Sequence, residues 1–295
     1  ILLEVAILLF LFRPKKTARS KATIALVFLI PIFCLGILIL RPSDQPQVWI
    51  LDVGQGLSVG IIKKERAVLI DAGGYLPQYG NIGKNVIGAF LHFKNVKKID
   101  NLFITHFHED HTNGIKGLID IFGPLPIFVP SSGGLNLPQN VSFFFKLSSY
   151  QELPIFKEVN LKIFPVKAGS DPNNQALVFK ICLPSCNILV TGDIEEEGMI
   201  KLAPFLSNLN SEVIIMPHHG KYLQNLKWFL ENVKPHLAII SCGENSFGHP
   251  NPETISLLKE LGIKVLTTQK KGAICFRQTK RGGVQFATRK KFNLF

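Results

Sequence analysis

Apolar and polar positions divide the chain into a strongly apolar start and a longer part in which short apolar runs alternate with polar clusters. Beyond residue 47 these runs are rich in Val, Ile and Leu, and most end in Gly, Asp or His, a pattern typical of buried strands followed by turns. The clearest runs cover 48–56, 67–74, 101–106, 176–183, 187–193, 212–220 and 237–243, and shorter ones cover 127–130 and 161–166. They predict a β-rich domain.

Helical patterns fit between some of these runs. Asn251-Pro252-Glu253 is a plausible helix start, because Pro is well tolerated in the first turn. The predicted helices cover 83–93, 112–122, 195–206, 224–233 and 252–261. Strands mixed with helices in this way predict an α/β sandwich with helices outside two sheets.

The first forty residues have a different composition. Residues 22–40 contain no charged side chain, and 19 residues are close to the length that a bilayer core requires. A signal peptide and a buried core helix are the alternatives, but no small-residue cleavage site follows the run and no polar face interrupts it. The basic loop 13–21 is expected to stay cytoplasmic, which would place everything after residue 40 on the far side of the membrane.

The expected organisation follows from these patterns. Because the chain starts with Ile1 and a short apolar run, we expect it to be the tail of a longer, multi-pass protein of the inner or plasma membrane. The predicted parts are transmembrane segments in 1–40, a linker at 41–47, the α/β domain at 48–276 and a basic tail at 277–295, which is either an extra strand pair or a disordered end.

Charge and cysteine content narrow the class of partner. The net charge of +12 favours an anionic partner, either nucleic acid or an acidic membrane surface, and does not choose between them. The five cysteines are scattered without the spacing of a zinc ribbon.

The densest chemistry lies in "NLFITHFHEDHTNG" at 101–114. Residues i and i+2 at a strand end point the same way, so His106 and His108 can offer imidazoles to one metal ion. Asp110 and His111 follow on the next turn and can face a second metal. Imidazole and carboxylate ligands suit zinc, and carboxylates with fewer imidazoles suit manganese. A solvated polar loop, the alternative, would not require this spacing.

Three later clusters add candidate ligands. "TGD" places Asp193 just beyond a strand, where its carboxylate can bridge two metals. "PHHG" supplies His218 and His219, and "FGHP" supplies His249. Each cluster alone is a weak signal, but together they predict one metal centre.

The His-x-His-x-Asp-His pattern, followed by "TGD" and a late His, resembles the metallo-β-lactamase fold, a four-layer αββα sandwich. "LDVGQG", "LIDAGG", "NNQALVF", "LVTGDIE", "PHHG" and "FGHP", taken in order, resemble the C-terminal domain of ComEC-type competence proteins. The resemblance implies a polytopic membrane protein that imports transforming DNA as a single strand, with DNA, the membrane and other parts of a DNA-uptake channel as partners.

The resemblance also implies a role for each matching residue. It makes six residues the ligands of two divalent metal ions: His106, His108, Asp110, His111, Asp193 and His249. It places His218 and His219 at the substrate phosphate, as catalytic residues together with Asp110. Asn173 falls where other members of the superfamily have a histidine ligand, and we expect it to contact substrate.

Two residues depart from the family pattern. Leu57 stands after "DVGQG" where Asp is usual, and Lys221 stands after "PHHG" where Ser is usual. Lys can bind phosphate as a point charge, so Lys221 is a candidate substrate-binding residue.

The sequence therefore predicts a membrane-anchored, metal-dependent nuclease that acts during DNA uptake. Two alternatives stay open. One is a catalytically weak module that guides DNA or binds metal, and the other is a membrane-tethered metallo-hydrolase of another ester.

Overall fold

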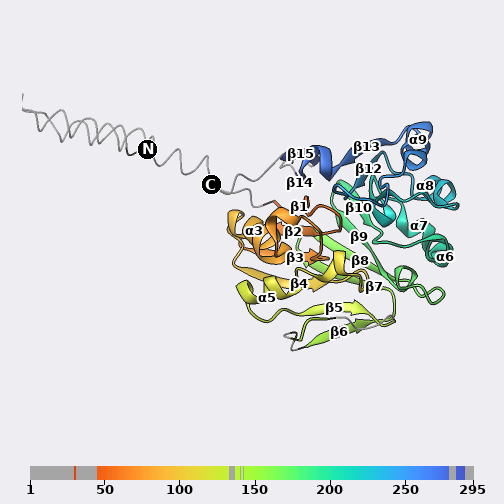
Figure 1. Cartoon of the computed structure of the whole chain (residues 1–295). Coiled ribbons are helices and arrows are strands. Elements are labelled where there is room, and N and C mark those ends of the chain that lie inside the picture. Colours follow the sequence, from red (N-terminus) through yellow and green to blue (C-terminus); the bar gives the residue numbers. More distant parts are fainter. Residues whose placement is uncertain are drawn as a thin grey trace, which may run out of the picture. The chain divides into compact units, whose positions relative to one another are not determined.

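Two β-sheets packed face to face form the framework of residues 44–295 (Figure 1). This computed structural model describes residues 45–132, 137–139, 141, 143–278 and 284–289, together with residue 30. The transmembrane segments predicted within 1–40 therefore lie, apart from residue 30, outside the described residues. Among the residues that are described, no helix has both the length and the apolar character needed to cross a bilayer.

The first sheet has eight strands in the order β15-β14-β1-β2-β3-β4-β5-β6. Its strands from β3 to β6 run parallel, and the others are antiparallel. The strands are β1 (Gln47–Ile50), β2 (Val59–Lys63), β3 (Arg66–Ile70), β4 (Lys98–Phe103), β5 (Ile127–Pro130), β6 (Phe144–Leu147), β14 (Ala273–Gln278) and β15 (Val284–Arg289). β15 comes from the predicted basic tail, so the sheet extends beyond residue 276.

The second sheet has seven strands in the order β13-β12-β11-β10-β9-β8-β7. Its strands from β10 to β13 run parallel, and the others are antiparallel. The strands are β7 (Gln151–Phe156), β8 (Val159–Pro165), β9 (Leu177–Leu183), β10 (Cys186–Val190), β11 (Val213–Ile215), β12 (Leu237–Ile240) and β13 (Lys264–Thr267).

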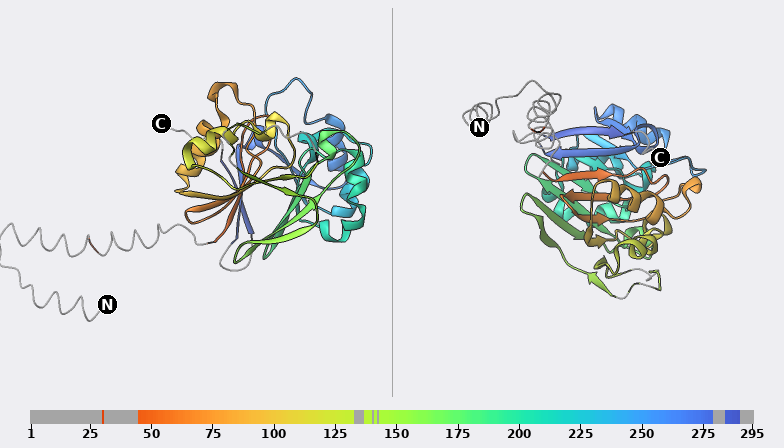
Figure 2. Two further views of the ribbon diagram at one scale, coloured as in Figure 1. Left: turned by 90° about the horizontal axis from the view of Figure 1, so that it is seen from below. Right: turned by 90° about the vertical axis from the view of Figure 1, so that its left-hand side faces the viewer.

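Helices cover the outer face of each sheet (Figure 2). Those packed on the first sheet are η2 (Gly83–Gly88), α3 (Ala89–Phe93) and α5 (Ile115–Phe122). Those packed on the second sheet are α6 (Glu196–Lys201), α7 (Leu206–Leu209), α8 (Leu226–Val233) and α9 (Pro252–Glu260). Short helical turns complete the chain: η1 (Pro77–Tyr79), α4 (Glu109–Thr112), η3 (Pro172–Asn174), η4 (Ala203–Phe205), η5 (Pro217–Gly220) and α10 (Thr268–Lys271).

Successive side chains of one strand enter different cores. Val48 and Ile50 of β1 point into the core between the sheets, whereas Trp49 points into the core under the helices of the first sheet. On β10, Ile188 joins the central core and Leu189 joins the core under the helices of the second sheet. Because both faces of these strands are buried, their sequences are continuously apolar. The layers are therefore helix, sheet, sheet and helix, which confirms the predicted α/β sandwich.

Candidate metal centre

The candidate ligands follow the carboxyl ends of strands in both sheets. His106 and Asp193 are each the third residue after a strand, β4 and β10 respectively, and His218 and His219 follow β11 at the third and fourth positions. β3 and β4 are parallel, as are β10, β11 and β12, so within each set the carboxyl ends lie at the same edge of the sheet. This topology collects polar side chains from distant parts of the sequence.

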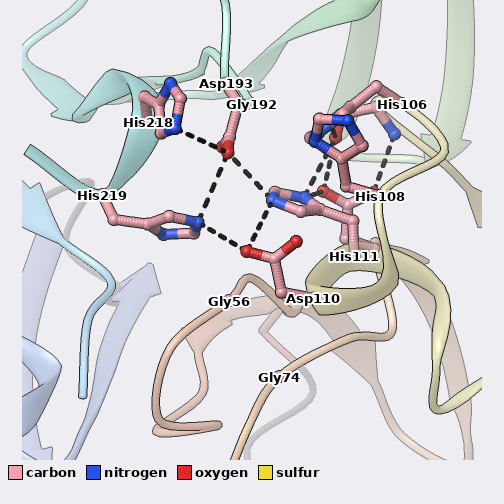
Figure 3. Close-up of polar contacts among 12 residues, drawn as sticks. Gly56, Gly74, His106, His108, Asp110, His111, Gly192, Asp193, His218 and His219 are labelled. Atoms are coloured by element: carbon pink, nitrogen blue, oxygen red, sulfur yellow. Dashed lines mark hydrogen bonds and ion pairs between the residues drawn. The ribbon is translucent and has the colours of Figure 1, made fainter. Parts of the chain in front are cut away.

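Four of these side chains form one compact cluster, which we call the anionic group: Asp110, His111, Asp193 and His219. One potential ligand atom from each lies within 4.8 Å of the others. Asp193 is central, with Oδ1 3.2 Å from Nε2 of His111 and Oδ2 3.4 Å from Nε2 of His219 (Figure 3). Oδ2 of Asp110 lies 3.1 Å from the same Nε2 of His219. Two carboxylates and two imidazoles are thus aimed at a common point.

The outer nitrogens of both histidines are held by other protein groups. Nδ1 of His111 lies 2.7 Å from Oδ2 of Asp71, and Nδ1 of His219 lies 2.9 Å from the carbonyl oxygen of Ser241. A proton on each Nδ1 can therefore be donated outward, which leaves the lone pair of Nε2 directed at the cluster. Histidines that bind metals are generally oriented by a second hydrogen bond of this kind.

The charges of the anionic group favour a cation at its centre. Burial lowers the pKa of His219, but the carboxylates of Asp193 and Asp110 outweigh it and raise that pKa to about 9. In the same way, burial is outweighed at His111, whose pKa the carboxylates of Asp193 and Asp71 raise well above its ordinary value. Burial raises the pKa of Asp193, yet His219 and His111 hold it well below its usual range. The buried carboxylates thus draw positive charge.

A second set of candidate ligands consists of His106, His108 and Asn173, and we call it the neutral group because it contains no carboxylate. The ring of His106 lies 4.6 Å from that of His108 and 4.2 Å from that of His111, measured between centroids. Burial, then the positive charge of His111, holds the pKa of His106 well below its usual range, so this imidazole is neutral. Among the described residues, neither its buried Nε2 nor the buried Oδ1 of Asn173 has a hydrogen-bond partner.

His218 and His249 lie at one side of the anionic group. Nε2 of His218 is 4.0 Å from Oδ2 of Asp193, and its ring centroid is 5.7 Å from that of His249. The structure thus brings His219 into the four-residue group, whereas the resemblance assigns a ligand role to His249. The assignment of each residue to metal or substrate remains a prediction.

Lys221 is held by an acidic neighbour. Its Nζ lies 2.5 Å from Oε1 of Glu195, and the same oxygen is 2.9 Å from Nδ1 of His218. Glu195 therefore links the unusual Lys221 to the candidate catalytic His218. Leu57, the other departure from the family pattern, is buried in the core between the sheets.

The backbone is strained where the two histidines follow β11. His218 has a φ of 47° and His219 a φ of 54°, so two successive residues with side chains are left-handed. Such a conformation costs about 1–2 kcal/mol per residue. It turns the chain sharply after Pro217 and presents one imidazole to Asp193 and Asp110 and the other to Glu195.

Close backbone approach requires glycine at two positions. A Cβ at Gly73 would lie 2.2 Å from the backbone nitrogen of His111. Gly192 has a φ of 57°, and a Cβ there would lie 2.8 Å from Cβ of Thr105. Because Gly192 follows β10 and Thr105 follows β4, this approach brings together the two sheet edges that carry the candidate ligands.

Sequence reasoning assigned no role to Asp71 and Thr105, which support the site. Both are fully buried. Oδ1 of Asp71 accepts from the backbone nitrogen of Thr105, and Oδ2 accepts from its hydroxyl, each at 2.7 Å. The available signal was the acid in "LIDAGG", a carboxylate directly after a buried strand.

The residues present fit a divalent cation. His106 Nε2 and Asn173 Oδ1 are buried polar atoms without hydrogen-bond partners in the described part of the chain, and such atoms are costly unless something binds them. The carboxylates of Asp110 and Asp193 supply negative charge, and nitrogen and oxygen ligands of this kind suit zinc or manganese. The six predicted ligands and His219 are the residues that would hold such ions.

Comparisons with known proteins identify relatives of this chain. ComE operon protein 3 of Bacillus subtilis is 27% identical over 322 residues, which cover 96% of this chain and 39% of that protein. Competence protein ComA of Neisseria gonorrhoeae is 27% identical over 248 residues, which cover 83% of this chain and 34% of that protein. The predicted resemblance to competence proteins is confirmed, and the chain spans less than two fifths of the length of these relatives.

The fold is similar to that of solved proteins. The metallo-beta-lactamase fold protein YhfI from Bacillus subtilis superposes with a TM-score of 0.54 at 12% identity, covering 82% of this chain and 100% of that one. A family model described as the metallo-beta-lactamase superfamily matches residues 51–244, which include most of the candidate ligands. With its cluster of potential metal ligands, the chain thus agrees with the coarse prediction of a metal-dependent hydrolase. The chain belongs to the metallo-beta-lactamase superfamily.

Proposed function

We propose that this protein is a membrane-anchored, metal-dependent phosphodiesterase that cuts DNA during its uptake into the cell. The observation that carries the proposal is the position of Asp193. Its buried carboxylate faces His111 from one sheet and His218 and His219 from the other. A bridging carboxylate of this kind suits a pair of metal ions, as in many phosphodiester-cleaving centres.

The chain's own residues would share the chemical work. Divalent ions held by the anionic and neutral groups would activate water and offset the charge of a phosphodiester. His218 lies at the rim, with Nδ1 held by Glu195 and Nε2 directed at the centre. Nε2 is therefore the atom at which a proton can be held for the departing oxygen. General acid catalysis of this kind typically raises the rate about 10²-fold to 10⁴-fold.

Substrate binding would draw on the positive charge around this centre. Lys221 carries an ammonium group beside His218, and a phosphate must compete with Glu195 for it. Asn173 has a buried carboxamide oxygen without a partner and can serve as a weak ligand or a substrate contact. The net charge of +12 supports a polyanion as substrate.

Similarity to the two competence proteins supports DNA as the substrate and an uptake channel as the setting. We propose the membrane, on the same grounds and from the apolar run at 22–40, as the place of anchoring, with the metal centre on the extracytoplasmic side. A C-terminal reporter that is active only in the cytoplasm would contradict this placement.

The test is cleavage of single- and double-stranded DNA by the purified chain with manganese or zinc. We expect Asp193→Asn to abolish cleavage, and His218→Ala to slow it about a hundredfold or more while metal stays bound. His236→Ala is the matched control, because His236 is exposed and contacts none of the candidate ligands in the described structure. Intact DNA after incubation with the metal-loaded chain would refute the nuclease.

One rival has specific support. Leu57 removes an acid that the family usually has, and Glu195 neutralises Lys221. A module that binds metal and guides DNA without cutting it would show salt-sensitive DNA binding and no cleavage. A hydrolase of another ester would leave DNA intact and hydrolyse small esters instead.

A further inference from the structure

Phe247 is the most exposed large apolar side chain among the described residues, with 72% of its surface accessible. It lies in the loop between β12 and α9, within the sequence "GENSFGHPN" at 243–251. Its neighbours in the sequence from Gly243 to His249 are polar or Gly. A phenylalanine that is this exposed gains little of the hydrophobic stabilisation that burial of its ring would give.

The loop that carries Phe247 is held in one conformation by the side chain of Asn245. Oδ1 of Asn245 accepts from the backbone nitrogens of Phe247 and His249, each at 3.1 Å. Its Nδ2 donates to the carbonyl oxygens of Gly243 at 2.9 Å and His249 at 2.7 Å. The exposed ring is therefore presented by an ordered loop.

The same loop is fastened to the histidine turn of the metal centre. The backbone nitrogen of Asn251 donates to the carbonyl oxygen of Gly220 at 3.0 Å, and a Cβ at Gly220 would lie 3.0 Å from Pro250. The loop and the turn thus keep a fixed relation.

Aromatic rings lead from Phe247 to the centre. The ring of Phe247 is nearly parallel to that of His249, at 20° and 6.2 Å between centroids, and His249 lies 5.7 Å from His218. His218 in turn faces Asp193. A phosphodiester at the metal centre would therefore have a flat, exposed aromatic face a few side chains away.

We infer that Phe247 is a stacking platform for an unpaired base of a single-stranded nucleic acid whose phosphate lies at the metal centre. The inference rests on the proposed function and narrows its substrate to single strands or frayed ends. Every base has an aromatic face, so stacking gives affinity without sequence preference. In a duplex the bases already stack on one another and their faces are unavailable. A membrane contact usually involves several apolar residues with Lys or Arg beside them, and between residues 243 and 251 the loop has only Phe247 and Pro250 as apolar side chains and no Lys or Arg.

The first experiment measures binding of the manganese-loaded chain to a fluorescent oligothymidylate whose phosphodiester links are replaced by uncleavable analogues, so that no cleavage interferes. We expect Phe247→Ala to weaken binding about tenfold and Phe247→Tyr to preserve it, because stacking on an aromatic side chain is worth a factor of this size. Phe93→Ala is the matched control, because Phe93 is half-exposed on α3. A strand with abasic sites in place of thymidines should bind wild type and Phe247→Ala equally. Equal weakening of both strands by Phe247→Ala would overturn the inference.

A second experiment reports on the ring itself. In Phe247→Trp, the oligothymidylate should quench the emission that this residue adds to that of Trp49 and Trp228, and a duplex without ends should not. Quenching by the duplex alone, or a blue shift with anionic lipid vesicles but no response to the oligonucleotide, would contradict the inference and, in the second case, favour a membrane contact.

The two proposals can fail separately. If wild type cuts DNA and Phe247→Ala cuts and binds single strands equally well, the stacking platform is refuted and the nuclease stands. If wild type binds single strands through Phe247 but cuts no DNA, the nuclease is refuted and the platform stands.

Discussion

His106 of the neutral group lies beside His111 of the anionic group, with 4.2 Å between ring centroids, but the two groups differ in the ligands that they offer. In the anionic group, the carboxylate of Asp193 lies 3.2 Å from His111 and 3.4 Å from His219. In the neutral group, His106 and His108 approach each other edge to face, and the predicted third member, Asn173, has an uncharged carboxamide oxygen. One half of the site has two carboxylates that can concentrate a cation, and the other half has no carboxylate of its own.

This difference predicts an order of metal binding. A cation entering the anionic group neutralises the buried carboxylate of Asp193 and the partly exposed carboxylate of Asp110, whereas one entering the neutral group must rely on imidazole nitrogens and on sharing Asp193. We therefore expect the first ion to bind in the anionic group and the second to bind more weakly, with a preference for manganese where Asn173 replaces an imidazole.

The largest effect should come from removing the charge that both groups share. Asp193→Asn keeps the size of the side chain but loses the carboxylate, so we expect metal binding to fall at both positions and stoichiometry to drop from about two to below one. Elemental analysis after incubation with manganese or zinc measures this. Asp120→Asn, at an exposed acid on α5, is the control and should bind metal like wild type. Normal metal content in Asp193→Asn would contradict the prediction that both groups share the charge of Asp193.

The two groups also differ in how much of them the sequence could predict. His106, His108, Asp110 and His111 follow one strand, and their spacing alone indicates a metal site. His219 contacts Ser241 and Asp110, and Asp110 is distant in the sequence, so these contacts arise only when the sheets form. No local pattern ranks His219 against His218 or His249.

The same limit applies to the fold. Strands β1, β10 and β11 were predictable because both of their faces are buried and their sequences are continuously apolar. β6 was not, because Phe144 and Phe145 on this edge strand are exposed and follow no alternation. β7 was missed for a related reason: its residues are only partly buried, and Pro154 interrupts it.

The next prediction concerns the pH dependence of folding stability in the metal-free chain. The folded-state pKa of His219 is about 9, and its ordinary value is 6.5. The folded state thus holds this proton more tightly, so the stabilisation is complete below pH 6.5 and is lost as the pH rises through 9. At about 1.4 kcal/mol per pKa unit, the metal-free chain should lose roughly 3 kcal/mol of stability over this range. Denaturant unfolding at pH 6 and pH 10 measures it.

A variant separates His219 from other titrating groups. His219→Gln should flatten the pH dependence of stability in the metal-free chain, and His236→Ala, at an exposed histidine, is the comparison variant. If the folding stability of wild type and of His219→Gln depends equally on pH, the anionic group does not hold a proton on His219.

A smaller effect is expected from the buried carboxylate behind His111. Asp71→Asn has the same shape, and Asn tolerates the left-handed φ of 57° at this position. It removes the charge that orients His111 through Nδ1, so metal affinity should fall about tenfold to a hundredfold. Titration with zinc measures the change. If Asp120→Asn lowers the affinity as much as Asp71→Asn, the effect is one of overall charge and the positioning role is contradicted.

The smallest effect is expected from a variant that strengthens the neutral group, so that it differs less from the anionic group. Asn173→His places an imidazole where the superfamily usually has one, and Oδ1 of Asn173 has no partner to lose. An added nitrogen ligand should strengthen the weaker site several-fold and move its preference from manganese towards zinc. The anionic group should keep its affinity, because Asn173 is not part of it. Competitive loading with both metals, followed by elemental analysis, distinguishes the two sites.

Asn174→His is unsuitable as a control, because Oδ1 of Asn174 accepts from the backbone of Glu195 and Gly198. Gln175→His on the same turn is the better choice, and it should leave the metal preference unchanged. If Asn173→His binds a second ion no more tightly than wild type, the weakness of the neutral group does not come from Asn173, and the lack of a carboxylate among its own ligands is the remaining cause.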